Sequence, residues 1–331
     1  MLGFCTSPVF IQHDTGPHHP ERPDRIRAIF KAVRDSGLVV SPNSLDDFGL
    51  PFGLRPLGLP PLVELTPQPA EERWLLSVHP QQLVDYVRHV SLLNGVLDQS
   101  DTPCEPRSFA TALLAVGAGL RCCDAVMSGE VRRAFAAIRP PGHHAEPARS
   151  MGFCLFNNIA IAARYLQQVH GIGKIAIVDF DVHHGNGTQA VFESDPTVLF
   201  ISLHQDPRTC YPGSGYVFET GIGAGEGTTL NIPFDPGAGD TEYLAAIRSR
   251  VIAALDVFLP EVLLIYAGFD AHRDDPLAQI QLSEDAFEEM TRELAGVADR
   301  HCRGRIISML EGGYNLRALG RSVVRHLVGL M

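Results

Sequence analysis

A stretch near the middle of the sequence brings together three side chains that can bind a metal ion. Residues 175–188 read IAIVDFDVHHGNGT, in which an apolar run is followed by Asp179, Asp181 and His183. Residues two apart in an extended chain point to the same side, so the two carboxylates and the imidazole would share one face. Asp oxygen and His nitrogen are both ligands of zinc and similar divalent cations. The stretch favours a metal site over a solvated loop, because so many charged groups rarely crowd an apolar strand without a partner.

Four mainly apolar runs, expected to be strands, are each followed by residues suited to catalysis. They are 133–138 with His143 and His144, 175–178 with Asp179, Asp181 and His183, 262–267 with Asp270, and 305–310 with Tyr314. In open α/β sheets, ligands bind at the carboxyl ends of the strands. If the runs are parallel strands, the residues that follow them meet at one edge and describe a single site.

Asp181, His183 and Asp270 are the expected metal ligands, and they supply two oxygens and one nitrogen. Three protein ligands leave a coordination position for water or substrate, as in catalytic zinc sites. A divalent ion held there would polarise a carbonyl and acidify a bound water. The ligand types do not separate zinc from ferrous iron.

The adjacent histidines His143 and His144 suit the roles of general base and general acid. Each needs an orienting partner on its far nitrogen, and Asp179 and Asn186 are available. A carboxylate raises the basicity of a histidine more than an amide does, so we expect the two pKa values to differ. Tyr314, on a Gly-Gly turn, could donate a hydrogen bond to an oxyanion. These groups suit the hydrolysis of an unactivated amide without a nucleophilic side chain.

The segments that must position these residues alternate between strands and helices. Apolar residues recur at intervals of three and four from 109 to 127, which predicts an amphipathic helix. Further helices are expected at 25–36, 81–90, 158–169, 241–258 and 283–300, and strands at the four runs above and at 198–203. Such alternation predicts an α/β fold with a mostly parallel sheet flanked by helices on both faces.

Two further regions carry weaker signals. Residues 41–70 are rich in proline and leucine, which favours an irregular surface excursion and a candidate contact surface. His13, His18 and His19 lie in a loop rich in proline and glycine. Without a spaced carboxylate partner, a structured loop held by hydrogen bonds is favoured there over a metal site.

The composition limits the classes of function. The chain has 331 residues, a net charge of −11, and no run of lysine or arginine, which argues against nucleic-acid binding. Length alone allows one large domain or two. No secretory start and no uninterrupted apolar run long enough to cross a bilayer are present, so no membrane association is expected. The seven cysteines lack CxxC spacing and are interpreted as reduced core thiols of a cytoplasmic protein.

Several motifs together resemble the zinc-dependent histone deacetylase family. They are PPGHHAEP, GFCLFNNIAIAARY, DFDVHHGNGTQ, YPGSG, YAGFDAH and LEGGYN. The resemblance extends from HPERP at 19–23 to the C-terminus, and it implies one domain, 1–331, with an arginase/deacetylase-like fold. The chain looks most like the class II branch and its bacterial amidohydrolase relatives, because Asn186 stands where class I enzymes carry an aspartate.

The resemblance also implies individual roles. The zinc ligands would be Asp181, His183 and Asp270. Asp179 would orient His143, Asn186 would support His144, and Tyr314 would polarise the substrate carbonyl. A potassium ion would lie near Asp179, with Ser202 contributing.

The resemblance further implies a narrow tunnel for an acylated lysine. Phe153 and Tyr211 would form its walls, although from spacing alone they would more simply be core aromatics. Gly152 would let the substrate pass close to the backbone. Asp101 lies where the family has a rim carboxylate that holds the backbone amides of the substrate.

The sequence leaves the exact substrate and the activity open. Polyamine-selective relatives carry a glutamate a few residues past the metal aspartate, whereas this chain has Leu277, which favours acylated lysine. Acetylated polyamines stay an alternative substrate, because the acidic residues Asp274 and Asp275 lie close by in the sequence and a cationic substrate favours an acidic gate. A catalytically silent acyl-lysine binder is a further candidate, and so is a binuclear manganese hydrolase. The manganese enzyme is disfavoured because Gly185 and His272 occupy the positions of its second-metal carboxylates. The oligomeric state is open.

Overall fold

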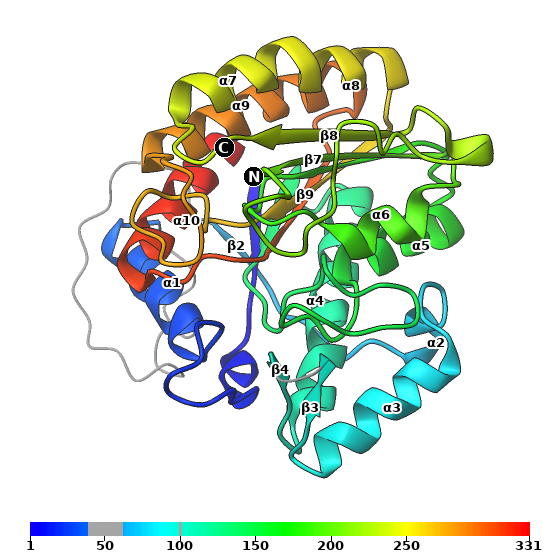
Figure 1. Ribbon diagram of the computed structural model, residues 1–331, viewed down its shortest axis with the longest axis vertical. Coiled ribbons are helices and arrows are strands. Elements are labelled where there is room, and N and C mark those ends of the chain that lie inside the picture. Colours follow the sequence, from blue (N-terminus) through cyan, green and yellow to red (C-terminus); the bar gives the residue numbers. More distant parts are fainter. Residues whose placement is uncertain (39–61, 99–100) are drawn as a thin grey trace.

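The computed structural model describes residues 1–38, 62–98 and 101–331, and one parallel sheet organises this part of the chain (Figure 1). Its eight strands have the order β2-β1-β5-β10-β9-β6-β7-β8. All the strand pairs within it are parallel. The strands are β1 Leu2–Cys5, β2 Val63–Leu65, β5 Arg133–Ala136, β6 Ile175–Asp179, β7 Val198–Gln205, β8 Thr229–Phe234, β9 Val262–Ala267 and β10 Ile306–Leu310.

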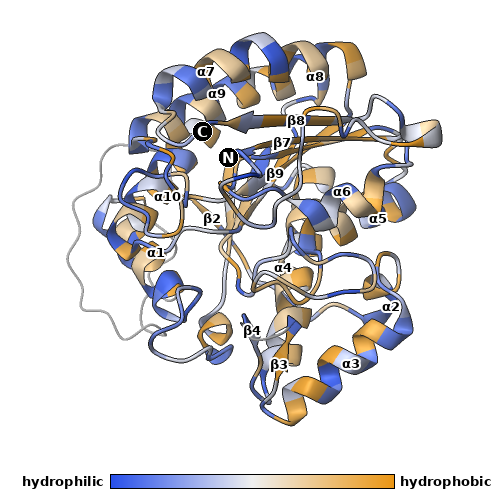
Figure 2. Cartoon of the chain, in the orientation of Figure 1, coloured by the Kyte–Doolittle hydropathy of each residue, from blue (hydrophilic) through white to orange (hydrophobic). Residues whose placement is uncertain are grey.

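The four central strands are buried along their whole length. Every residue of β5, β10, β9 and β6 is buried. Continuous apolar runs are typical of parallel strands covered on both faces. In Figure 2 the strands are coloured mostly hydrophobic, whereas hydrophilic residues lie mainly on the surrounding helices.

Helices cover both faces of the sheet (Figure 1). One layer contains α4, α5 and α6, and the other contains α1, α7, α8, α9 and α10. The helices are α1 Asp24–Asp35, α2 Glu72–Leu75, α3 Gln81–Leu92, α4 Ser108–Ser128, α5 Asn158–His170, α6 Asn186–Phe192, α7 Asp240–Ala246, α8 Ile252–Phe258, α9 Glu284–His301 and α10 Leu316–Leu330. A small antiparallel ribbon of β3 Val96–Leu97 and β4 Thr102–Pro103 lies apart from the main sheet. The predicted α/β architecture is confirmed.

Several elements differ from the sequence prediction. Residues 241–258 were expected as one helix, but a π-helical turn at Ile247–Val251 separates α7 from α8. Within the Pro/Leu-rich region, residues 41–61 lie outside the described residues, whereas Val63–Leu65 pairs in parallel with β1. The prediction of irregular structure is therefore wrong for residues 63–65, which form strand β2. Strands β1 and β8 and helices α6 and α10 were not predicted. The extent of the domain, 1–331, stays a prediction.

Helix α4 bears on the expectation that no uninterrupted apolar run could cross a membrane, because Arg121 and Asp124 interrupt its apolar residues. By length and composition α4 could do so, and 78% of its most apolar window is buried inside the protein. The helix contacts β5 and β10 and packs against α5. The apolar surface of α4 is thus used as core.

The cysteines are mostly buried thiols, and two of the N-terminal histidines form hydrogen bonds within the protein. None of the seven cysteines forms a disulfide, and Cys210 alone among them is only partly buried. His13 Nδ1 lies 2.7 Å from Ser108 Oγ, and His19 bonds main-chain carbonyls through both ring nitrogens. The prediction of a loop held by hydrogen bonds is confirmed for these two histidines.

Candidate metal and catalytic site

The four strands expected to deliver the site are neighbours in the sheet. The order β5-β10-β9-β6 forms its centre, and every pair is parallel and in register. Their carboxyl ends therefore lie at one edge. The polar segments after them, although far apart in sequence, meet above this edge, as predicted.

Asp181, His183 and Asp270 come together as a compact group. One ligand atom of each lies within 4.8 Å of the others. His183 Nδ1 is 3.0 Å from Asp181 Oδ1 and 3.1 Å from Asp270 Oδ2. Zinc–ligand bonds of about 2 Å would separate tetrahedral ligands by roughly 3.3 Å, so the spacing suits such an ion.

Backbone groups hold the two carboxylates in this orientation. The amide of Gly312 donates to Asp181 Oδ2 at 2.8 Å, and the amide of Val182 donates to Asp270 Oδ1 at 2.9 Å. The remaining oxygens face His183. A side chain could not replace the hydrogen of Gly312, since a Cβ there would lie 2.0 Å from Asp270 Oδ2. The glycine thus permits the close approach of the last loop to the ligands.

Acidic side chains gather in this buried region. Asp179, Asp181, Asp270 and Glu311 are all essentially inaccessible to solvent. Burial, reinforced by the charge of Asp181, raises the pKa of Asp270 to about 7. Burial likewise raises the pKa of Glu311 to about 8. Buried carboxylates are costly without a cationic partner, so the donor set and its charge fit a divalent cation.

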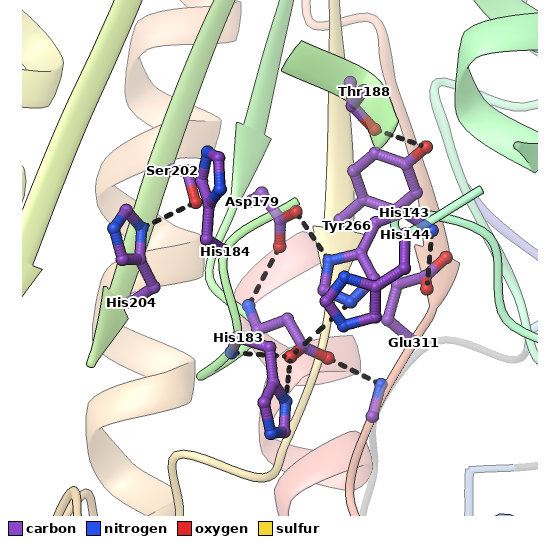
Figure 3. A network of polar contacts seen from close by, with 12 residues as sticks. His143, His144, Asp179, His183, His184, Thr188, Ser202, His204, Tyr266 and Glu311 are labelled. Carbon is purple, nitrogen blue, oxygen red and sulfur yellow. Dashed lines mark hydrogen bonds and ion pairs between the residues drawn. The ribbon is translucent and has the colours of Figure 1, made fainter. Parts of the chain in front are cut away.

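His143 is held by a carboxylate. Its Nδ1 lies 2.9 Å from Asp179 Oδ2, and its Nε2 lies 3.8 Å from Asp181 Oδ1 (Figure 3). Burial lowers the pKa of His143, but the charges of Asp181 and Asp179 outweigh burial and raise the pKa to about 10. Glu311 fixes the adjacent backbone by accepting hydrogen bonds from the amides of Gly142 and His143.

His144 is held by an amide. Its Nδ1 lies 2.8 Å from Asn186 Oδ1. Burial, together with the neighbouring His143 and His183, holds the pKa of His144 well below the usual value. The pKa values of His143 and His144 therefore differ in the predicted direction. Gly152 packs against the His144 ring, since a Cβ there would lie 2.4 Å from its Cδ2.

Aromatic rings surround the histidines and Tyr314. The edge of Tyr211 approaches His144 with ring centroids 5.0 Å apart. Phe153 and Tyr314 form an edge-to-face pair at 5.9 Å. The structure therefore places Tyr211 and Phe153 beside the site rather than in the core of the fold.

Asp101 is connected to Phe153 through the side chain of Thr102. Thr102 Oγ1 donates to Asp101 Oδ1 at 2.7 Å and accepts from the amide of Phe153 at 3.0 Å. His19, whose ring lies 4.7 Å from that of Phe153, contacts the carbonyl of Asp101 at 3.1 Å. Burial raises the pKa of the Asp101 carboxyl. Its predicted position near the rim is consistent with these contacts.

Asp275 has a structural role that the sequence interpretation missed. Its Oδ2 accepts from the amide of Tyr314 at 2.6 Å, and its Oδ1 accepts from the amide of Leu277 at 3.1 Å. The Leu277 side chain is 39% exposed. Asp275 therefore joins the loop after Asp270 to the loop of Tyr314. The signal for this role in the sequence was Pro276, which follows Asp275 and favours a turn.

Arg25 and Glu21 were also missed as supports of the site. Arg25 Nε donates to the carbonyl of Gly313 at 2.7 Å, and its guanidinium lies 5.0 Å from the ring centroid of Tyr314. Glu21 pairs with Arg25 at 3.0 Å and with Arg139. The HPERPDR segment carried these charges, but nothing in its spacing indicated their partners.

Ser202 lies beside Asp179, since the two residues pair in register across β6 and β7. Ser202 Oγ is 2.9 Å from His204 Nδ1 (Figure 3). The fold therefore brings together Asp179 and Ser202, which were expected near a potassium ion. The ion itself stays a prediction.

Comparisons with known proteins place this site in a family context. A model of the histone deacetylase domain matches residues 19–330. A probable deacetylase from Archaeoglobus fulgidus is 39% identical over 316 residues, which cover 96% of this chain and 82% of the relative. A histone deacetylase-like amidohydrolase from Pseudomonas aeruginosa is 40% identical over 267 residues, which cover 79% and 70%. The chain spans 52% of a longer relative, the chloroplastic histone deacetylase 14 of Arabidopsis thaliana.

The solved structure of the HDA15 HD domain has a similar fold. It matches with a TM-score of 0.87 and 35% identity, over 99% of this chain and 89% of that one. This similarity confirms the predicted fold.

Proposed function

Because the chain belongs to the histone deacetylase family, we propose that this hydrolase removes acetyl or other short acyl groups from lysine side chains. The observation that carries the proposal is the meeting of Asp181, His183 and Asp270 with two separately oriented histidines. Such a set suits amide hydrolysis by an activated water.

Asp181, His183 and Asp270 would hold the metal, which is zinc in this proposal and ferrous iron as the alternative. When bound, such an ion acidifies water and polarises a carbonyl. The backbone amides of Gly312 and Val182 keep the two carboxylates aimed at the same point. Asp179 and Ser202 would lie beside the structural potassium ion.

The two histidines divide the proton transfers. Asn186 brings no charge to His144, so that imidazole stays neutral and takes the proton of the attacking water. The Asp179 carboxylate stabilises the charged form of His143, which can give a proton to the departing amine. Groups whose pKa values are pushed apart by their surroundings are natural acid–base partners.

Further side chains would bind the substrate and stabilise the negative charge that develops on its carbonyl oxygen. The Tyr314 hydroxyl would donate a hydrogen bond to the oxyanion. Phe153 and Tyr211 would line the path of the lysine alkyl chain, and Gly152 would leave room beside His144. Asp101 would hold backbone amides of the substrate.

Acylated lysine is preferred here over acetylated polyamines because Asp275 is not free to bind a cation, and the carboxylate of Asp274 lies 4.0 Å from Arg321. Asp275 is buried and uses both oxygens on backbone amides, so it does not offer a free carboxylate to a cation. Leu277 adds an apolar side chain to the same loop.

The test is a comparison of kcat/KM for acyl-lysine peptides, acetylspermidine and acetylputrescine, with metal content measured in parallel. We expect turnover of an acetyl-lysine peptide that a chelator abolishes and that zinc restores. A strong preference for polyamines would instead indicate an acetylpolyamine amidohydrolase. Binding without turnover would indicate a silent acyl-lysine binder, and two manganese ions per chain would indicate a binuclear hydrolase.

A further inference from the structure

Asn186, the partner of His144, has a carboxylate partner of its own. Asn186 Nδ2 donates to Glu146 Oε1 at 2.8 Å, while Asn186 Oδ1 lies 2.8 Å from His144 Nδ1. His144, Asn186 and Glu146 thus form a continuous chain of hydrogen bonds. The neighbouring His143 has no such relay, because it contacts the carboxylate of Asp179 directly.

The two histidine partners differ in a way that makes Glu146 informative. A carboxylate such as Asp179 presents only acceptors, so either oxygen can receive an N–H from His143. An amide presents an acceptor at one end and donors at the other. If Asn186 were turned over, its NH2 group would face His144 Nδ1 and would require the other imidazole tautomer.

Glu146 removes this ambiguity. An ionised carboxylate accepts hydrogen bonds and cannot donate them, so the end of Asn186 that faces Glu146 must be the NH2 group. The other end is then the carbonyl, which requires N–H at His144 Nδ1. Nε2 of His144 is left without a proton and is available to accept one.

The surroundings keep this arrangement fixed. Asn186 is 9% exposed, so water has little access to replace its partners. Helix α6, which begins at Asn186, packs on the backbone after His144, and a Cβ on Gly187 would lie 2.4 Å from the carbonyl oxygen of Ala145. Glu146 lies in a turn in which its amide donates to the carbonyl of Arg149 at 2.9 Å.

The adjacent cation Arg149 forms its side-chain hydrogen bonds with Asp98 rather than with Glu146. Arg149 directs its guanidinium to Asp98, with Nε 3.0 Å from Asp98 Oδ1. The carboxylate of Glu146 therefore remains directed to Asn186. A charge-assisted hydrogen bond of this kind is stronger than one between neutral groups.

We propose that Glu146 is a positioning residue that orients the Asn186 amide and thereby sets the tautomer of His144. The inference rests on the proposed amide hydrolysis, in which His144 accepts a proton. Glu146 acts only through Asn186 and does not touch the substrate.

The kinetic test compares Glu146→Ala, Glu146→Gln and the wild type with an acetyl-lysine peptide. Loss of a residue that orients an active-site histidine typically costs about 10-fold or more. We expect Glu146→Ala to lower kcat by about 10-fold, with KM changed by less than about twofold. Glu146→Gln keeps an acceptor for Asn186 Nδ2 but can also donate to a turned-over Asn186, so its kcat should fall between those of Glu146→Ala and the wild type.

Glu261→Ala is the matched control. Glu261 also accepts hydrogen bonds in a loop, from the amides of Gly173 and Lys174, but it precedes β9 and lies at the opposite edge of the sheet. Its removal should leave kcat unchanged. An equal loss of kcat in Glu261→Ala and Glu146→Ala would contradict the proposal.

The double variant separates positioning from a general effect on structure. If Glu146 acts through Asn186, Glu146→Ala should lower kcat no further in an Asn186→Ala background. Full additivity of the two losses, or wild-type kcat in Glu146→Ala, would overturn the inference.

The tautomer can be observed without turnover. In protein labelled with ¹⁵N-histidine, the His144 ring signals can be assigned by their loss in His144→Gln. We expect the wild type to show a protonated Nδ1, and Glu146→Ala to show a mixture of tautomers. The same tautomer in both proteins would contradict the inference. An absence of turnover by the metal-loaded wild type, with a protonated Nδ1, would contradict the proposed function alone.

Discussion

Two buried charged clusters lie side by side at the carboxyl edge of the sheet, and they balance their charges differently. The guanidinium cluster consists of Glu21, Arg25 and Arg139, all fully buried. The acidic cluster consists of the metal-site carboxylates and their neighbours, namely Asp179, Asp181, Asp270 and Glu311. Arg25 connects the two clusters, because it also donates to the main-chain carbonyls of Glu311 and Gly313.

The guanidinium cluster is satisfied within the protein. Glu21 pairs with both arginines, and the remaining N–H groups reach carbonyls such as that of Phe10, 2.9 Å from Arg139 Nη1. Burial raises the pKa of Glu21, but Arg139 outweighs burial and lowers it to about 2. Every charge in this cluster therefore has an internal partner.

The acidic cluster lacks a comparable set of permanent cations. Its cationic neighbours, His143 and His183, are charged only when they are protonated. Burial raises the pKa of Asp179 to about 6, in contrast to the lowered pKa of Glu21. The difference teaches that the charges of the first cluster are matched inside the protein, whereas those of the second suit the proposed binding of a cation.

The largest expected effect is the loss of the metal from Asp181→Ala. One carboxylate ligand disappears, so metal content and deacetylase activity should both fall to background. A chelator should lower the Tm of the wild type and leave that of the variant unchanged, because only a protein that binds the ion is stabilised by it. Metal analysis and thermal unfolding check this prediction, with the exposed pair residue Asp256→Ala as control. Full metal content in Asp181→Ala would refute the assignment of this ligand.

Glu21→Gln should instead destabilise the fold. Removing one partner of a buried ion pair typically costs about 3–5 kcal/mol in the free energy of unfolding. Urea unfolding measures the loss. Glu71→Gln, in an exposed pair with Arg73, should cost less than about 1 kcal/mol. Equal losses of unfolding free energy in Glu21→Gln and Glu71→Gln would show that the buried ion pairs of Glu21 contribute no more to stability than an exposed pair.

Tyr314→Phe tests the residue between the clusters. Its ring lies beside Arg25, while its hydroxyl is assigned to the oxyanion. Loss of one oxyanion donor lowers kcat by about 10²–10³-fold, and the metal content should stay unchanged. Tyr86→Phe, on the exposed surface of α3, is the control. Near-wild-type kcat in Tyr314→Phe would remove this residue from the mechanism.

The smallest effect is the dependence of stability on pH through Glu21. Its pKa is 4.5 in the unfolded reference and about 2 in the folded protein. A lowered folded pKa gives stability that is complete above pH 4.5 and is lost as the pH falls towards 2. The difference in unfolding free energy between the wild type and Glu21→Gln should therefore narrow over this range. A difference that stays constant would show that Glu21 does not contribute by its charge.

The sequence by itself determined much of the centre of the fold. The runs that became β5, β6, β9 and β10 are mainly apolar, and every residue of these strands is buried, as is typical of parallel strands covered on both faces. The two edge strands were missed for different reasons. Strand β2 has only three residues, and β8 contains Pro233, which weakens a strand signal.

The sequence also determined the chemistry of the site, because ligand types and the alternation of Asp179, Asp181 and His183 are local properties. Tertiary structure decided which partners those groups have. The bonds from Asn186 to Glu146 and from Asp275 to Tyr314 join residues 40 and 39 positions apart. Spacing along the chain cannot specify such contacts, because the order of strands in the sheet sets them. The same order placed Arg25 against the Tyr314 loop, 288 residues from the Gly313 carbonyl that it binds.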